Sequence, residues 1–73
     1  MKKTYKLRDL DCANCAAKME NAIAKLLEVN TVTVSFMTQK MIVDYAEGVD
    51  EAEGLAKIKK TIHRVEPDCE VVG

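Results

Sequence analysis

Apolar and polar residues alternate along two stretches of the chain, and alternation with a period of two is typical of half-buried β-strands. In residues 4–8 (T-Y-K-L-R) it places Tyr5 and Leu7 on one face and predicts a first strand. Residues 31–36 (T-V-T-V-S-F) predict a second strand. The β-rich residues 41–45 (M-I-V-D-Y) follow after a short gap, so a hairpin is the simplest connection.

A helical period of 3.6 residues marks two further segments. The first runs from about Cys15 to near Glu28 and is rich in good helix formers. The second follows Asp50, a predicted N-cap, and stops before Pro67, because proline excludes the helical conformation of the residue before it. The apolar faces are Cys15, Met19, Ala22, Ile23 and Leu26 in the first helix and Leu55, Ile58, Ile62 and Val65 in the second. A short last strand is predicted at residues 69–72.

The predicted elements therefore follow the order βαββαβ. A helix on each side of a hairpin suits a four-stranded antiparallel sheet with both helices on one face, which is the α+β ferredoxin-like sandwich. We expect residues 1–73 to form a single domain, since there are no repeats or low-complexity segments. A chain of this length buries only about 60% of its unfolded surface, so its stability should be modest.

The charge balance narrows the range of partners. Lys and Arg number 11 and Asp and Glu number 12, and only 4% of the residues are aromatic, so nothing favours binding to nucleic acid. No apolar run approaches the roughly 18 residues that span a bilayer, and the start lacks the apolar core of a secretory signal. We expect a cytoplasmic domain without direct membrane insertion, either freestanding or one module of a longer membrane protein.

The candidate chemistry lies in residues 11–15, D-C-A-N-C. On the predicted fold Cys12 lies in the loop after the first strand, and Cys15 lies in the first turn of the first helix. Unpaired N–H groups and the helix dipole favour a thiolate there, so a lowered pKa is expected for Cys15. Two sulfurs at this spacing can converge on one ion at about 2.3 Å each.

Two other uses of a C-x-x-C pair fit the sequence less well. A structural zinc site needs four protein ligands, and here there is no second C-x-x-C and only a lone His63. A thiol–disulfide enzyme of the thioredoxin kind usually opens on a β-α-β unit, whereas here a hairpin follows the first helix directly. An incomplete site suits an ion that is released again, and no catalytic residues are visible in this domain.

Residues 10–27 (L-D-C-A-N-C-A-A-K-M-E-N-A-I-A-K-L-L) resemble the heavy-metal-associated (HMA) domain, the metal-binding module of copper chaperones and of P1B-type ATPases. The resemblance extends over essentially the whole chain and implies the ferredoxin-like fold. In that family the motif usually reads G-M-T-C-x-x-C. Here Asp9 replaces the usual glycine, Leu10 the methionine, and Asp11 the threonine or other uncharged residue. Leu10 can fill the methionine's apolar site under the loop.

Asp11 makes a divalent ion the expected cargo. Copper(I) held by two thiolates already carries a net negative charge and prefers soft ligands, whereas Zn²⁺ with two thiolates is neutral and accepts an Asp oxygen. Zinc, cadmium and lead exporters among the P1B-type ATPases are similar to this chain in their acidic residue before the first cysteine. We therefore expect Asp11, Cys12 and Cys15 to bind Zn²⁺, Cd²⁺ or Pb²⁺ reversibly. A solvated loop carboxylate or a helix cap is the alternative role for Asp11.

The resemblance also implies partners. A monomeric domain of an inner-membrane or plasma-membrane exporter would deliver its ion to the membrane and ATP-binding domains, or regulate them; a freestanding metallochaperone, including one for copper, is the alternative. Cys69 is either a further ligand, which would favour Cd²⁺ or Pb²⁺, or a core residue on the face of Val71. Met19 is expected on the core stripe and Met41 in a strand, both as core or surface residues and not as ligands, and His63 is expected to face solvent.

Overall fold

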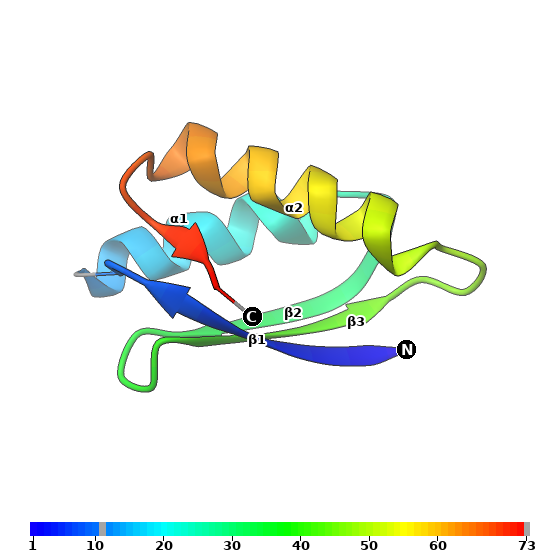
Figure 1. Ribbon diagram of the computed structural model, residues 1–73, viewed down its shortest axis with the longest axis horizontal. Helices are drawn as coiled ribbons and strands as arrows, with labels where there is room; N and C mark the ends of the chain where they lie inside the picture. Colours follow the sequence, from blue (N-terminus) through cyan, green and yellow to red (C-terminus); the bar gives the residue numbers. More distant parts are fainter. Residues whose placement is uncertain (11, 73) are drawn as a thin grey trace.

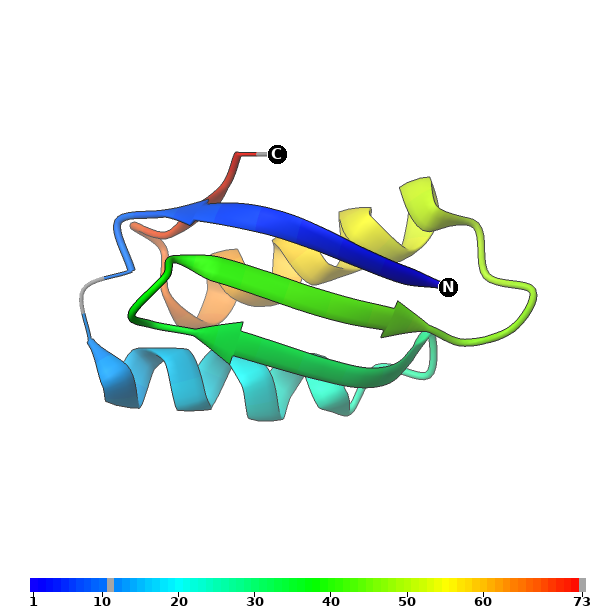
Figure 2. The ribbon, with the colours of Figure 1, turned by 90° about the horizontal axis from the view of Figure 1, so that it is seen from below.

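The alternating and helical patterns produce the predicted order of elements in a computed structural model that describes residues 1–10 and 12–72. The elements are β1 (Lys2–Arg8), α1 (Ala13–Ala24), β2 (Val29–Ser35), β3 (Lys40–Tyr45), α2 (Glu51–Val65) and β4 (Glu70–Val71). The strands pair antiparallel in the order β2-β3-β1-β4. Both helices cover the same face of this sheet (Figures 1 and 2), so the ferredoxin-like α+β sandwich is confirmed.

The core lies between the sheet and the two helices. The strands contribute alternate residues to it, as the period of two predicts, and the helices contribute one stripe each. Met19 is fully buried, which confirms its predicted place on the core stripe, and Met41 in β3 is fully buried as well. The buried apolar set is Tyr5, Leu7, Leu10, Ala16, Met19, Ile23, Val29, Met41, Val43, Tyr45, Ile58, Ile62 and Cys69.

The predicted end of the first helix near Glu28 is wrong, because α1 ends at Ala24. The amides of Lys25 and Leu26 donate to carbonyls three residues back, at N···O distances of 3.3 and 3.0 Å, so the last turn tightens into a 3₁₀ geometry. Val29 is then already buried at the start of β2, which begins earlier than predicted. A register shift after Val29 interrupts the alternation, which explains why the sequence pattern begins two residues late.

Strand β2 forms one edge of the sheet, and α1 supplies a partner for its outer side. Glu20 lies on α1, and its carboxylate oxygen accepts a hydrogen bond from the backbone N–H of Val34 at 2.8 Å. An edge strand normally leaves such donors open to another chain. This donor is occupied by a side chain of the same molecule.

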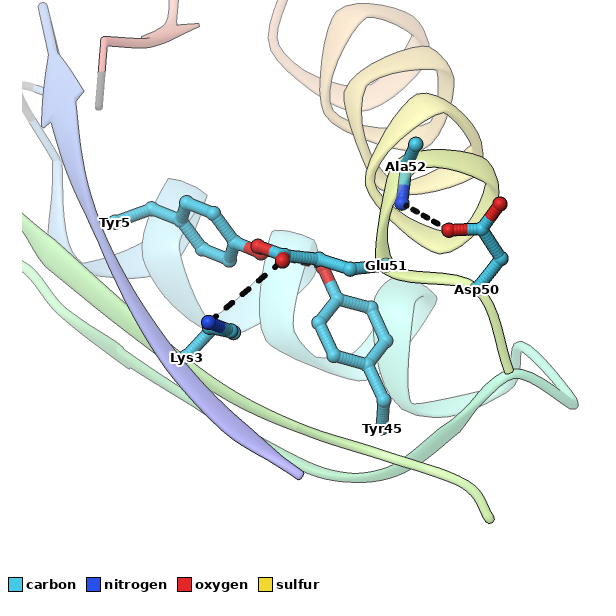
Figure 3. Close-up of polar contacts among 6 residues, drawn as sticks. All are labelled: Lys3, Tyr5, Tyr45, Asp50, Glu51 and Ala52. Atoms are coloured by element: carbon cyan, nitrogen blue, oxygen red, sulfur yellow. Dashed lines mark hydrogen bonds and ion pairs between the residues drawn. The ribbon is translucent and has the colours of Figure 1, made fainter. Parts of the chain in front are cut away.

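Asp50 caps α2 as predicted, because its carboxylate accepts a hydrogen bond from the backbone N–H of Ala52 at 3.1 Å (Figure 3). The helix ends at Val65, and Glu66, the residue before Pro67, has a non-helical backbone with φ −141° and ψ 88°. The predicted stop before the proline is therefore confirmed.

A polar network, buried at its pair of tyrosines, fastens the start of α2 to the sheet. The Tyr5 hydroxyl from β1 donates to the Glu51 carboxylate at 2.8 Å, and the Tyr45 hydroxyl from β3 lies 2.8 Å from that of Tyr5 (Figure 3). The Lys3 ammonium lies 3.7 Å from the other carboxylate oxygen. Burial, and then the hydrogen bonds to Tyr45 and Glu51, raise the pKa of Tyr5, so its hydroxyl remains a donor over the physiological range.

The ring of Tyr45 also explains a glycine inside α2. A Cβ atom added at Gly54 would lie 2.6 and 2.9 Å from two ring carbons of Tyr45. The Tyr45 side chain is 1% exposed and its hydroxyl is hydrogen-bonded, so the ring has little freedom to move. Glycine at this helical position is therefore required by close packing of the helix on the sheet.

We expect Gly54→Ala to destabilise the domain by about 1–3 kcal/mol through overpacking against Tyr45. The exposed helical position Ala56 offers a matched control, where Ala56→Gly should cost about 1 kcal/mol and so show the ordinary preference of helices for alanine. Urea unfolding followed by circular dichroism measures both. A Gly54→Ala domain as stable as the wild type would contradict the packing argument.

Candidate metal centre

Three connections meet at one end of the molecule: the end of β1 with the start of α1, the turn between β2 and β3, and the segment from α2 to β4 (Figures 1 and 2). Cys12 is the N-cap residue of α1, with an extended backbone at φ −142° and ψ 131°. Cys15 lies in the first turn of α1, as predicted, and both cysteines are half-buried. The two thiols are therefore held at a helix start and remain within reach of an ion from solvent.

The backbone before the cysteines takes a conformation suited to glycine. Asp9 has φ +63°, in the left-handed region that aspartate tolerates better than most side chains. Leu10 follows and is 1% exposed, so it fills the apolar site under the loop as predicted. Asp11, the third predicted ligand, lies outside the described residues.

Glu66 is the site residue that the sequence interpretation missed. Glu66 is the C-cap residue of α2, and its carboxylate lies close enough to the Cys15 thiol to favour the protonated form of that thiol. This contact, followed by the one with Cys12, raises the pKa of Cys15 to about 12. A proline-terminated helix end could have indicated Glu66, because the ferredoxin-like order brings that end of α2 to the start of α1.

The lowered pKa predicted for Cys15 is wrong, and it is the pKa of Cys12 that is lowered. The main cause is the nearby backbone N–H of Cys15, and the Cys15 thiol and the backbone N–H of Asn14 lower the pKa of Cys12 further. The physical reason is that Cys12 occupies the cap position toward which the first-turn N–H groups point. Cys15 lies inside the first turn of the helix, and its thiol is near the Glu66 carboxylate instead.

The described residues bring two thiols and a carboxylate to the start of α1 as candidate ligands. Cys12 has the more easily ionised thiol, Cys15 would have to lose its proton to bind an ion, and the Glu66 carboxylate lies near Cys15. Within residues 1–10 and 12–72, no group of three or more His, Cys, Asp and Glu side chains is already gathered in a geometry that could hold a metal ion. The site therefore differs from a preassembled structural cage.

The remaining candidate ligands are a buried cysteine and an exposed histidine. Cys69 is 1% exposed and belongs to the core cluster, which is the second of its two predicted roles. Its backbone N–H donates to the carbonyl of Glu66 at 3.1 Å and so fastens the segment that carries the Glu66 side chain. His63 is exposed on α2, as predicted. No helix in the described part of the chain is long and apolar enough to cross a membrane.

A cysteine pair at the first turn of α1, beside the last turn of α2, places this sandwich among small domains that bind soft metal ions. Residues 4–68 match the heavy-metal-associated domain, and the chain belongs to that family.

Two of its relatives are metal-transporting ATPases. Over 41 residues the chain is 49% identical to the zinc/cadmium/lead-transporting P-type ATPase of Escherichia coli K12, a match that covers 56% of this chain and 6% of that protein. It is 32% identical over 71 residues to the cadmium, zinc and cobalt-transporting ATPase of Bacillus subtilis 168, which covers 97% of this chain and 10% of the ATPase. The chain thus spans a tenth or less of the length of these relatives.

Solved structures share the fold at low identity. The CopZ metallochaperone superposes with a TM-score of 0.77 at 17% identity, covering 99% of this chain and 100% of CopZ. A copper form of a CopA variant from Bacillus subtilis superposes with a TM-score of 0.75 at 21% identity, covering 99% of this chain and 88% of the other. At these identities the likeness establishes the fold.

We expect Glu66→Gln to lower the pKa of Cys15, because the substitution removes the carboxylate that favours the protonated thiol. Glu70→Gln is a matched control, since Glu70 is exposed and its carboxylate pairs with Arg8 instead. Titration of the cysteine ¹³Cβ shifts in the reduced, metal-free domain measures both thiols. Ionisation of Cys15 before Cys12 in the wild type would contradict the assignment.

Proposed function

We propose that this domain binds one divalent soft or borderline ion, Zn²⁺, Cd²⁺ or Pb²⁺, through Asp11, Cys12 and Cys15, as the cytoplasmic metal-binding domain of an exporting P-type ATPase. The observation that carries the proposal is the carboxylate of Glu66 beside the cysteine pair. Asp11 directly precedes Cys12 in the sequence, so two acidic residues accompany the two sulfurs.

The charge count distinguishes the possible ions. Two thiolates neutralise a divalent ion, and one carboxylate then leaves a single net negative charge. The same three groups around Cu⁺ leave a net charge of about minus two and offer oxygen to an ion that prefers sulfur. Since Zn²⁺ accepts both thiolate and carboxylate ligands, the acidic surroundings favour a divalent ion over Cu⁺.

The same ligands support reversible transfer. The thiolate of Cys12 is the first group available to an incoming ion, and Cys15 releases its proton as the second sulfur binds. Half-buried thiols leave a coordination position open to water or to a ligand of the receiving site. The ion can therefore pass by stepwise ligand exchange to the membrane domain, or its binding can regulate turnover, while ATP hydrolysis belongs to other domains.

A freestanding copper metallochaperone is the second candidate, and the likeness to CopZ favours it. The two functions share the cysteine pair and differ in the ion and in the parent protein. A full-length gene that encodes membrane spans would exclude the chaperone. A thiol–disulfide enzyme is a further alternative from another class, which a reduction potential near that of thioredoxin, about −270 mV, would support.

We expect Cys12→Ser and Cys15→Ser each to abolish tight Zn²⁺ binding, because one sulfur and a carboxylate do not hold the ion. Asp11→Asn and Glu66→Gln should each lower the ratio of Zn²⁺ to Cu⁺ affinity by about tenfold, the lower end of the effect of residues that support a metal site. The easier ionisation of Cys15 in Glu66→Gln favours both ions alike, so the ratio reports the loss of the carboxylate. Competition titrations of the reduced domain with chelators for Zn²⁺ and Cu⁺ measure the preference, with Glu70→Gln as the neutral control.

The double variant Asp11→Asn/Glu66→Gln gives the sharpest comparison. It keeps both sulfurs and nearly the same side-chain volumes while it removes both carboxylates. An unchanged ratio of Zn²⁺ to Cu⁺ affinity in this variant would rule out the divalent assignment.

A further inference from the structure

The turn between β2 and β3 holds the metal loop, the segment that joins β1 to the cysteines of α1, and it does so through Gln39. The side-chain oxygen of Gln39 accepts a hydrogen bond from the backbone N–H of Leu10 at 3.1 Å. The side-chain nitrogen of Gln39 donates to the backbone carbonyl of the same residue. One amide therefore satisfies both backbone groups of Leu10 from a position 29 residues away in the chain.

The backbone of Gln39 takes part in the same arrangement. Its carbonyl accepts a hydrogen bond from the N–H of Leu7 at 2.7 Å, and its side-chain nitrogen also donates to the carbonyl of Phe36 at 2.9 Å. Gln39 thus contacts the chain on both sides of Asp9, whose φ is +63°. A single residue of the turn fixes the bend by which β1 passes into the metal loop.

The need for this contact follows from the sheet. Pairing between β1 and β3 ends at Lys6 opposite Lys40. Beyond that point the chain leaves β3 while Leu10 is still 1% exposed, so its buried N–H and C=O groups need partners from outside the ladder. The Gln39 amide has donor and acceptor groups in a fixed planar arrangement, which matches the two groups of one residue.

We propose that Gln39 is a positioning residue for metal capture. Resting on the function proposed above, the inference is that Gln39 holds the backbone of Leu10, two positions before Cys12, so that the cysteines are preorganised before an ion arrives. Preorganisation reduces the ordering that binding must otherwise impose on the loop, and this raises affinity without adding a ligand.

Three substitutions of Gln39 distinguish a role in positioning the loop from a role in the stability of the fold alone. Gln39→Asn keeps the amide and tolerates the φ of +54°, but it is one methylene too short to reach Leu10. Gln39→Glu keeps the length and can still accept from the Leu10 N–H, but it cannot donate to the carbonyls of Leu10 and Phe36 and places a charged oxygen against them. Gln39→Gly suits the positive φ and removes the side chain, so it replaces Gln39→Asn if that variant folds poorly. Thr38→Ala, an exposed change in the same turn, is the matched control.

The measurements are Zn²⁺ affinity by chelator competition, the Cd²⁺–thiolate charge-transfer band, and exchange of the Leu10 amide proton in the metal-free domain. We expect Gln39→Asn and Gln39→Glu each to weaken Zn²⁺ binding by about tenfold and to speed Leu10 exchange, with Thr38→Ala unchanged. Urea unfolding on the same samples separates loop effects from loss of global stability.

The decisive comparison is between the exchange rate of the Leu10 amide proton and the affinity of the domain for metal. If Leu10 exchanges faster in Gln39→Asn while metal affinity and the charge-transfer band stay at wild-type values, Gln39 is merely structural and the inference is overturned. If the wild type prefers Cu⁺ to Zn²⁺, the divalent function fails, and the Gln39 variants are compared by Cu⁺ affinity at the same cysteines. A tenfold loss of Cu⁺ affinity would then support the positioning role, and unchanged affinity would overturn it.

Discussion

The metal loop depends on the burial of Leu10. Its side chain is 1% exposed in the core beneath the loop, and burial of a leucine contributes about 1.5–3 kcal/mol. The left-handed turn at Asp9 directs the chain into that site. The loop is therefore anchored from below, whereas Cys12 and Cys15 at the start of α1 remain half-buried at the surface. Leu10 anchors the loop in the core, while Cys12 and Cys15 remain accessible to an ion.

The fold could be predicted from the sequence because most elements have regular patterns. The alternation in β1 and β3 and the helical stripe of α2 each bury one face against the same core. The errors lie where backbone hydrogen bonding outweighs the pattern. The early end of α1 at Ala24 has no glycine or proline to mark it, and the irregularity after Val29 hides the first residues of β2.

For the candidate site, the sequence identifies the residues that lie close together in the chain and misses those that come from distant segments. The C-x-x-C spacing identifies Cys12 and Cys15 directly, and a helix-dipole argument predicts that one of them ionises easily. It selects the wrong one, because the cap position belongs to Cys12 and a carboxylate from the end of the other helix faces Cys15. Glu66 and Gln39 reach the site from distant segments, and no spacing rule links them to the cysteines. Their roles follow only from the folded arrangement of the three connections.

The hydrogen bond from the Val34 N–H to the Glu20 carboxylate matters where many copies of such a domain are crowded together. The edge strand of a β-sheet has unpaired N–H and C=O groups that can pair with a strand of another chain. Two such domains that meet repeatedly could therefore join their sheets. With the Glu20 carboxylate on that edge, a neighbouring chain must first displace a charged group from its donor. Encounters between this domain and a second copy are thereby biased away from pairing along this strand. One side chain on α1 therefore helps to keep neighbouring molecules separate.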